Sequence, residues 1–190
     1  MYSDVFAVEG GIAAVKALAD AQLDPVAAAL YAALDGVVRA LDADRGEDSF
    51  LRAVVAYHLI AEGSIGRANQ NFVASQFDRL GSFPGLREAQ RLAVRDEVRH
   101  IGIGVSYTRR RLTRDGACAR ALIAEIVDGF QALGDSLLAD AAPNLLDDFA
   151  GAYGAEPATL WAEVLHQLHL RLRSIGFSHA ARESRIALRP

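Results

Sequence analysis

The sequence predicts an all-α protein built as a bundle of long helices, and three observations lead to this prediction. The 190 residues are 52% hydrophobic and 23% charged, a composition typical of a folded chain with a sizeable core. Residues that start and end helices recur along the chain. No stretch alternates apolar and polar residues for long enough to indicate a strand. We expect one domain over residues 1–190, with residues 177–190 as a flexible tail.

Proline and glycine set the expected helix boundaries in the first half of the chain. Asp24-Pro25 combines an N-cap residue with a proline at the first helical position. Gly46 and Gly81 lie where periodic segments stop, as glycines after a helix do. These signals predict helices over residues 4–21, 25–42 and 48–80.

The second half follows the same rules. Pro84 opens a periodic segment, Gly116 ends it, and Glu156-Pro157 repeats the N-cap and proline pattern. Helices of about 30 residues are about 45 Å long, which favours a bundle. The expected helices cover residues 84–114, 117–140, 144–152 and 157–175.

Composition and charge argue against several classes of protein. The formal net charge of −4 disfavours nucleic acid as a partner. Charged residues interrupt every apolar run well before the roughly 20 residues that a membrane-spanning helix needs. The start of the chain lacks the features of a secretory signal, and Cys118 is the single cysteine, so we expect a cytoplasmic protein. We interpret the basic cluster at Arg109, Arg110, Arg111 and Arg114 as a solvated helix end.

Glu97 and His100 form a Glu-x-x-His motif within the expected helix 84–114. This spacing puts the carboxylate and the imidazole on one helical face, where both can reach one metal ion. An isolated buried carboxylate costs several kcal/mol, so Glu97 must be neutralised, paired or bound to a metal. The rest of that face is small or apolar and consists of Ala93, Val94, Ile101 and Gly104.

Glu62 lies on a similar face of the preceding helix, between Leu59 and Ile65. If the two helices are antiparallel, the heights of Glu62 and Glu97 differ by about 7 Å, which helix stagger can absorb. One Glu plus one Glu-x-x-His is half of the dinuclear carboxylate site of ferritin-like bundles. The alternative interpretation is a buried salt-bridge cluster with an arginine such as Arg67 or Arg99.

A resemblance to a known family covers nearly the whole chain. Residues 57–63 are YHLIAEG, residues 83–86 are FPGL, and residues 95–100 are RDEVRH. Together with RLRSIG at residues 171–176, these segments resemble the second half of the ribonucleotide reductase small-subunit superfamily, and they look most like its ligand-binding oxidase branch.

The resemblance implies that Glu62, Glu97 and His100 are metal ligands, with Glu97 bridging two ions. It implies that Asp96 orients a histidine of the first half, and that Tyr57 matches the tyrosine this branch links covalently to a valine there. The branch is known for a mixed manganese/iron centre, for O2 activation and for a long-chain fatty acid held near the metals. The implied function is therefore a dinuclear Mn/Fe or di-iron oxidase.

The first half of that family carries another Glu and another Glu-x-x-His, whereas residues 1–61 contain no Glu-x-x-His. We therefore expect a ferritin-like bundle that lacks the first two metal-bearing helices. Because missing partner helices leave apolar faces uncovered, we also expect association into a homodimer.

Three alternatives stay open. Glu125, Glu163 and His166 would complete a six-ligand site within the chain, although their faces are mostly polar. A ribonucleotide reductase small subunit is disfavoured, because docking in that family uses an acidic C-terminus and this one carries several arginines. The third alternative is a catalytically silent helical binding or dimerisation module.

Overall fold

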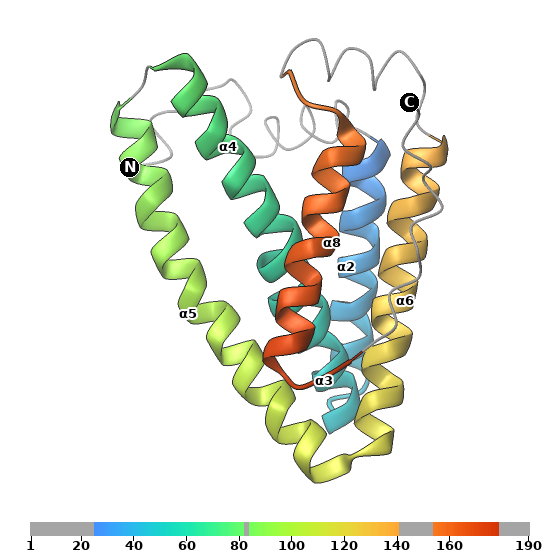
Figure 1. Ribbon diagram of the computed structural model, residues 1–190. Helices are drawn as coiled ribbons and strands as arrows, with labels where there is room; N and C mark the ends of the chain where they lie inside the picture. The colour runs from blue at the N-terminus through green and yellow to red at the C-terminus, as the bar shows by residue number, and fades with distance from the viewer. Residues whose placement is uncertain (1–24, 82–83, 141–153, 179–190) are drawn as a thin grey trace, which may run out of the picture. The chain divides into compact units, whose positions relative to one another are not determined.

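The computed structural model describes residues 25–81, 84–140 and 154–178. These residues form helices and contain no strand, so the prediction of an all-α protein is confirmed (Figure 1). None of the helices in these ranges is long and apolar enough to cross a membrane. The expected helices 4–21 and 144–152 lie outside the described residues. The helices are α2 (Pro25–Ala43), α3 (Glu47–Val54), η1 (Val55–Gly66), α4 (Arg67–Leu80), α5 (Pro84–Asp115), α6 (Ala117–Asp140) and α8 (Pro157–Ser174).

The chain divides into two compact units, residues 1–36 and residues 37–190. In the first unit, the described residues are the first part of α2. The helices from α3 to α8 belong to the second unit, which contains the candidate site. The single domain expected over residues 1–190 stays a prediction.

The helix ends follow the local signals in the sequence. Gly81 and Gly116 have φ values of 61° and 50°, the left-handed backbone that glycine adopts without strain, and they end α4 and α5. Asp44 fixes the turn into α3, because its carboxylate accepts hydrogen bonds from the Gly46 N–H at 2.9 Å and the Ser49 hydroxyl at 2.8 Å.

The predicted helix over residues 48–80 is continuous, but its middle is a π-helix, η1, of 12 residues. Most π-helices are single turns, frequently at functional sites, so a segment of this length is unusual. The Ser64 hydroxyl donates a hydrogen bond of 2.6 Å to the carbonyl of Leu59, five residues earlier. The expectation of an ordinary α-helical face around Glu62 is therefore wrong.

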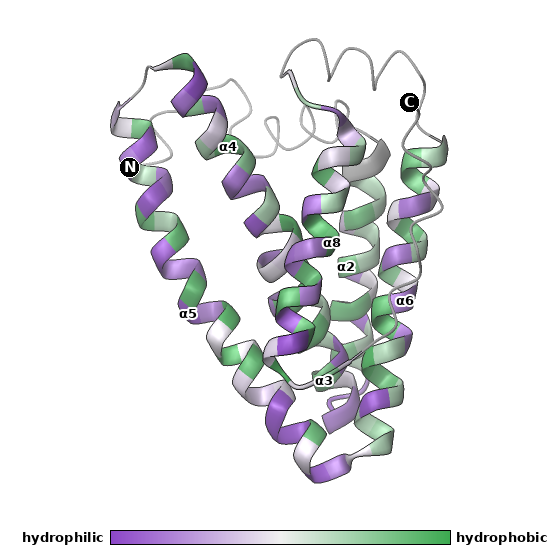
Figure 2. Ribbon diagram, viewed as in Figure 1, coloured by the Kyte–Doolittle hydropathy of each residue, from purple (hydrophilic) through white to green (hydrophobic). Residues whose placement is uncertain are grey.

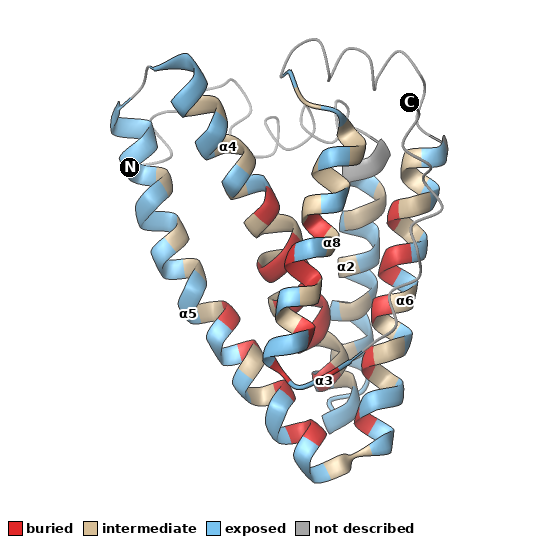
Figure 3. Ribbon diagram, viewed as in Figure 1, coloured by how far each residue is buried: buried red, intermediate tan, exposed pale blue. Residues whose placement is uncertain are grey.

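The core of the second unit lies around α3 and η1, and η1 packs against both α5 and α8. Figure 3 shows buried residues on these helices and on α6, whereas the first part of α5 is mostly exposed. Full burial of a Val, Leu or Ile side chain contributes about 1.5–3 kcal/mol to the stability of the folded state. The fully buried apolar side chains include Leu51, Val55, Leu59, Ile123, Val127 and Leu168.

The first half of α5 is only partly covered. Along residues 84–100 the side chains are exposed or half-buried, and the first buried residue is Ile101. Hydrophobic and hydrophilic residues are interspersed along this helix (Figure 2). The inward face predicted around Glu97 is therefore correct at Ile101 and Gly104, which are buried, and wrong at Ala93, which is exposed.

Arg111 is buried, with 5% of its surface exposed. Its guanidinium donates hydrogen bonds to the Glu47 carbonyl, to the Asp48 carboxylate and to Asp115. These bonds join the end of α5 to the first turn of α3. The interpretation of the basic cluster as a solvated helix end is therefore wrong for Arg111, because the residue is buried and two of its partners, Glu47 and Asp48, lie more than 60 positions away in the sequence.

Replacing Arg111 by leucine is expected to lower the free energy of unfolding by about 2–3 kcal/mol at neutral pH, because the charged hydrogen bonds of the buried guanidinium are lost. Hydrogen bonds from Arg114 and Arg111 lower the pKa of Asp115 to about 2. A lowered carboxyl pKa stabilises the folded state above the unfolded pKa, and this stabilisation disappears as the pH falls toward 2. The difference in the free energy of unfolding between wild type and Arg111→Leu should therefore shrink between pH 5 and pH 2.

Urea unfolding at several pH values measures this difference. Arg114→Leu is the matched control, because Arg114 pairs with the same Asp115 but is half-exposed. Losing this exposed ion pair should lower stability clearly less than losing Arg111 does. Equal losses in the two variants would contradict a special role for the buried guanidinium.

Candidate metal centre

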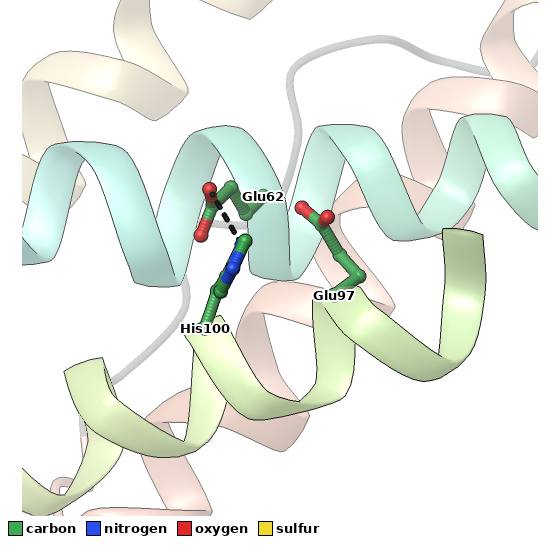
Figure 4. A group of neighbouring side chains, drawn as sticks. All are labelled: Glu62, Glu97 and His100. Carbon is green, nitrogen blue, oxygen red and sulfur yellow. Dashed lines mark ion pairs between the residues drawn. The ribbon is translucent and has the colours of Figure 1, made fainter. Parts of the chain in front are cut away.

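Glu62, Glu97 and His100 come together where η1 faces α5 (Figure 4). Each offers one ligand atom, and these atoms lie within 4.8 Å of one another. Glu62 comes from η1, and Glu97 and His100 come from α5. Within the described ranges, these are the His, Cys, Asp and Glu residues that form such a cluster.

The two oxygens of Glu62 have different neighbours. Its side chain is 12% exposed, and Oε2 lies 2.7 Å from Nδ1 of His58. Oε1 lies 3.6 Å from Nδ1 of His100, the ion pair drawn in Figure 4. One oxygen is therefore held by a neighbour on η1, and the other faces α5.

Glu97 is half-buried and lies beside a second carboxylate. Burial raises the pKa of Glu97, and the negative charge of Glu62 raises it further. The salt-bridge alternative predicted an arginine here, but Arg99 pairs with Asp96 at 3.1 Å and Arg67 bonds to a glutamine. Two carboxylates and an imidazole thus converge, and neither of those arginines makes an ion pair with them in the described structure.

The three donors fit one divalent ion. Two ligand atoms bound to one ion at about 2.0–2.2 Å lie about 3–4.4 Å apart, depending on the angle at the ion. The three donor atoms, which lie within 4.8 Å of one another, must therefore move closer together to bind one ion, a change that side-chain rotation can supply. Carboxylate oxygens and an imidazole nitrogen suit manganese and iron. Three protein ligands leave a second ion without its own set of donors.

Tyr57 and Asp96 flank the cluster and are both exposed. The negative charge of Glu62 raises the pKa of the Tyr57 phenol. Asp96 pairs with Arg99, and its Oδ2 lies 3.9 Å from Nε2 of His100, too far for a hydrogen bond. The roles that the resemblance implies for Tyr57 and Asp96 depend on a first half, so they stay predictions.

The alternative ligands Glu125, Glu163 and His166 are not brought into one cluster. Glu125 makes two hydrogen bonds with Arg52, at 2.8 Å and 2.9 Å. Glu163 accepts a hydrogen bond of 3.0 Å from Asn71, and His166 is exposed on α8. Because these carboxylates are engaged with different helices, the structure gives no support to a six-ligand site within the chain.

His58 is a residue of the site that was not predicted from the sequence. A Cβ added to Gly104 would lie 2.4 Å from the His58 Cβ, so the absence of a side chain at Gly104 lets His58 approach α5 closely. The spacing of four residues between His58 and Glu62 could have indicated this contact, because it places both side chains on one side of a helix.

Solved structures match this chain, although no protein-family model and no curated protein does. An R2-like ligand-binding oxidase from Sulfolobus acidocaldarius is 21% identical and matches with a TM-score of 0.63, over 85% of this chain and 54% of that chain. A single-residue variant of an R2-like ligand-binding oxidase, with an aerobically reconstituted Mn/Fe cofactor, is 22% identical with a TM-score of 0.66, over 82% and 53% of the two chains. The chain has the fold of the R2-like ligand-binding oxidases.

This result confirms the ferritin-like fold and the predicted resemblance at the level of structure. The chain spans about half the length of the R2-like ligand-binding oxidases that it matches. Their Mn/Fe cofactor is a property of those proteins.

Proposed function

We propose that this chain supplies one half of a dinuclear Mn/Fe or di-iron carboxylate centre, in an oxidase that activates O2 and binds a long-chain hydrophobic ligand. The convergence of Glu62, Glu97 and His100 on facing helices carries this proposal. The fold shared with R2-like ligand-binding oxidases supports it.

Glu62, Glu97 and His100 are the residues that would hold the metal. When bound, iron or manganese supplies the one-electron redox chemistry that reduction of O2 requires. The two carboxylates offset the charge of the cation, and the neutral imidazole of His100 adds a nitrogen donor. The carboxylate of Glu97 has two oxygens, so it could contact a second ion that is held by ligands from another segment.

A groove of about 370 Å³ lies between α4 and α5, and its apolar residues offer a place for part of the hydrophobic ligand that we propose. Its volume is within the range of small-molecule sites, about 300–1,000 Å³. Val94 lines the groove and lies three residues before Glu97 on α5. The other lining residues are the apolar Ala74, Phe77 and Pro84 and the polar or charged Arg67, Gln70, Asn71, Arg87, Glu88, Gln90 and Arg91.

A second copy of the chain is the partner we propose for the other half of the centre. Large apolar side chains are more than half exposed on α4 and α5, and such surfaces favour association. They are Leu80, Leu86, Val98 and Ile103.

Anaerobic loading with Mn²⁺ and Fe²⁺ tests the proposal, followed by metal analysis and light scattering. We expect about one ion per chain, because one set of three donors holds one ion, and a shift from monomer to dimer as metal is added. Mg²⁺ is the control, since it prefers oxygen ligands and water and should not drive association. A folded monomer that binds no metal would contradict the proposal and favour the catalytically silent module.

A further inference from the structure

His58 makes the shortest polar contact at the candidate centre. Its Nδ1 lies 2.7 Å from Oε2 of Glu62, and its side chain is 24% exposed. A carboxylate that binds a metal only accepts hydrogen bonds, so Nδ1 carries the proton and donates it. Charged hydrogen bonds of this kind are shorter and stronger than neutral ones.

The position of His58 is fixed from several sides. Its Cβ lies against Gly104 of α5, where an added Cβ would come within 2.4 Å. The ring of Tyr57 lies 5.2 Å away at an interplanar angle of 81°, an edge-to-face arrangement. The His58 carbonyl lies within the π-helix, 2.8 Å from where a Cβ on Gly63 would be. His58 is therefore a rigid support and not a freely rotating surface side chain.

This contact leaves the other oxygen of Glu62 available. Oε2 is engaged by His58, and Oε1 lies 3.6 Å from Nδ1 of His100. We propose that His58 is a positioning residue: its Nδ1–H holds Oε2 of Glu62, so that Oε1 is presented to an ion shared with Glu97 and His100. The inference rests on the proposed function, because it assigns His58 a role in building the same metal centre.

Mn²⁺ titration followed by electron paramagnetic resonance tests the role of His58. His58→Leu removes the donor and should weaken Mn²⁺ binding about 10–100-fold, the usual cost of losing a hydrogen bond to a metal ligand. His58→Asn keeps an N–H donor at the position of Nδ1 and should restore the affinity to within about threefold of wild type. His166→Leu, on the exposed face of α8, is the control and should bind like wild type. A His58→Leu variant with wild-type affinity would overturn the inference.

Pulsed electron paramagnetic resonance on the Mn²⁺-loaded protein separates a positioning role from direct ligation. We expect the signature of one coordinated imidazole, from His100, in wild type and in His58→Asn. A second coordinated imidazole in wild type that disappears in His58→Asn would make His58 a ligand and overturn the inference.

A measurement without metal separates this inference from the proposed function. Nitrogen-15 NMR of the metal-free protein should show His58 with its proton on Nδ1, and Glu62→Ala should shift the proton toward Nε2 because the acceptor is lost. His58→Asn identifies the signal. If wild type binds no Mn²⁺, the proposed function fails, while the position of the proton still tests the contact with Glu62. A ring with a proton on Nε2 and none on Nδ1 in wild type would overturn the inference whatever the metal result.

Discussion

Replacing Glu97 by alanine is expected to remove bound metal from this chain, whereas replacing His166 by alanine should leave the metal content unchanged. Glu97 supplies one of three donors that lie within 4.8 Å of one another, and two donors cannot hold the ion against water and buffer. Loss of a direct ligand should weaken binding by more than the roughly 10–100-fold cost of losing an outer hydrogen bond. Elemental analysis after dialysis against metal-free buffer measures the effect.

His166 is a suitable control because it belongs to the other Glu-x-x-His of the chain, with Glu163. It is exposed on α8, and Glu163 accepts a hydrogen bond from Asn71. The opposite pattern, with metal lost from His166→Ala and kept by Glu97→Ala, would place the ion at the Glu125, Glu163 and His166 set and reject the centre proposed above.

Substituting alanine for Gly104 is expected to lower the free energy of unfolding by about 1–3 kcal/mol, the usual cost of overpacking. The added Cβ would lie 2.4 Å from the His58 Cβ, and a Cβ cannot move unless its backbone moves. Relief of this clash must therefore push η1 and α5 apart. Because Glu62 is on η1 and the other two donors are on α5, Mn²⁺ affinity should fall together with stability.

Gly102→Ala is the matched control on the same helix. Nothing lies within 4 Å of a Cβ added there, and the residue is exposed. Alanine favours an exposed helix interior over glycine by about 0.5–1 kcal/mol, so this variant should be more stable than wild type. Urea unfolding of both variants checks the pair, and equal shifts would show that α5 does not pack on His58 as the structure indicates.

The sequence by itself determined the helices and the ligand motif, because both depend on neighbouring residues. Proline at a helix start and glycine with a positive φ after a helix act within one turn, so boundaries such as Pro84, Gly81 and Gly116 could be predicted closely. Glu97 and His100 share a face for the same local reason, since three residues make nearly one helical turn.

Packing between distant segments, and not the local sequence, brought the metal-binding cluster together. The cluster forms because η1 packs on α5, which brings Glu62 to a motif 35 positions later. The π-helical path of η1 was not predicted. The Arg171 side chain of α8 packs against this segment, 3.2 Å from where a Cβ on Gly63 would be.

Arg111 shows most directly what only the tertiary structure decided. On its own helix it follows two other arginines and has the pattern of a solvated end. The fold places the first turn of α3 beside it, and the Glu47 carbonyl and Asp48 carboxylate then accept its hydrogen bonds. A helical pattern specifies which face a side chain occupies, but burial and charge pairing depend on which other helix covers that face.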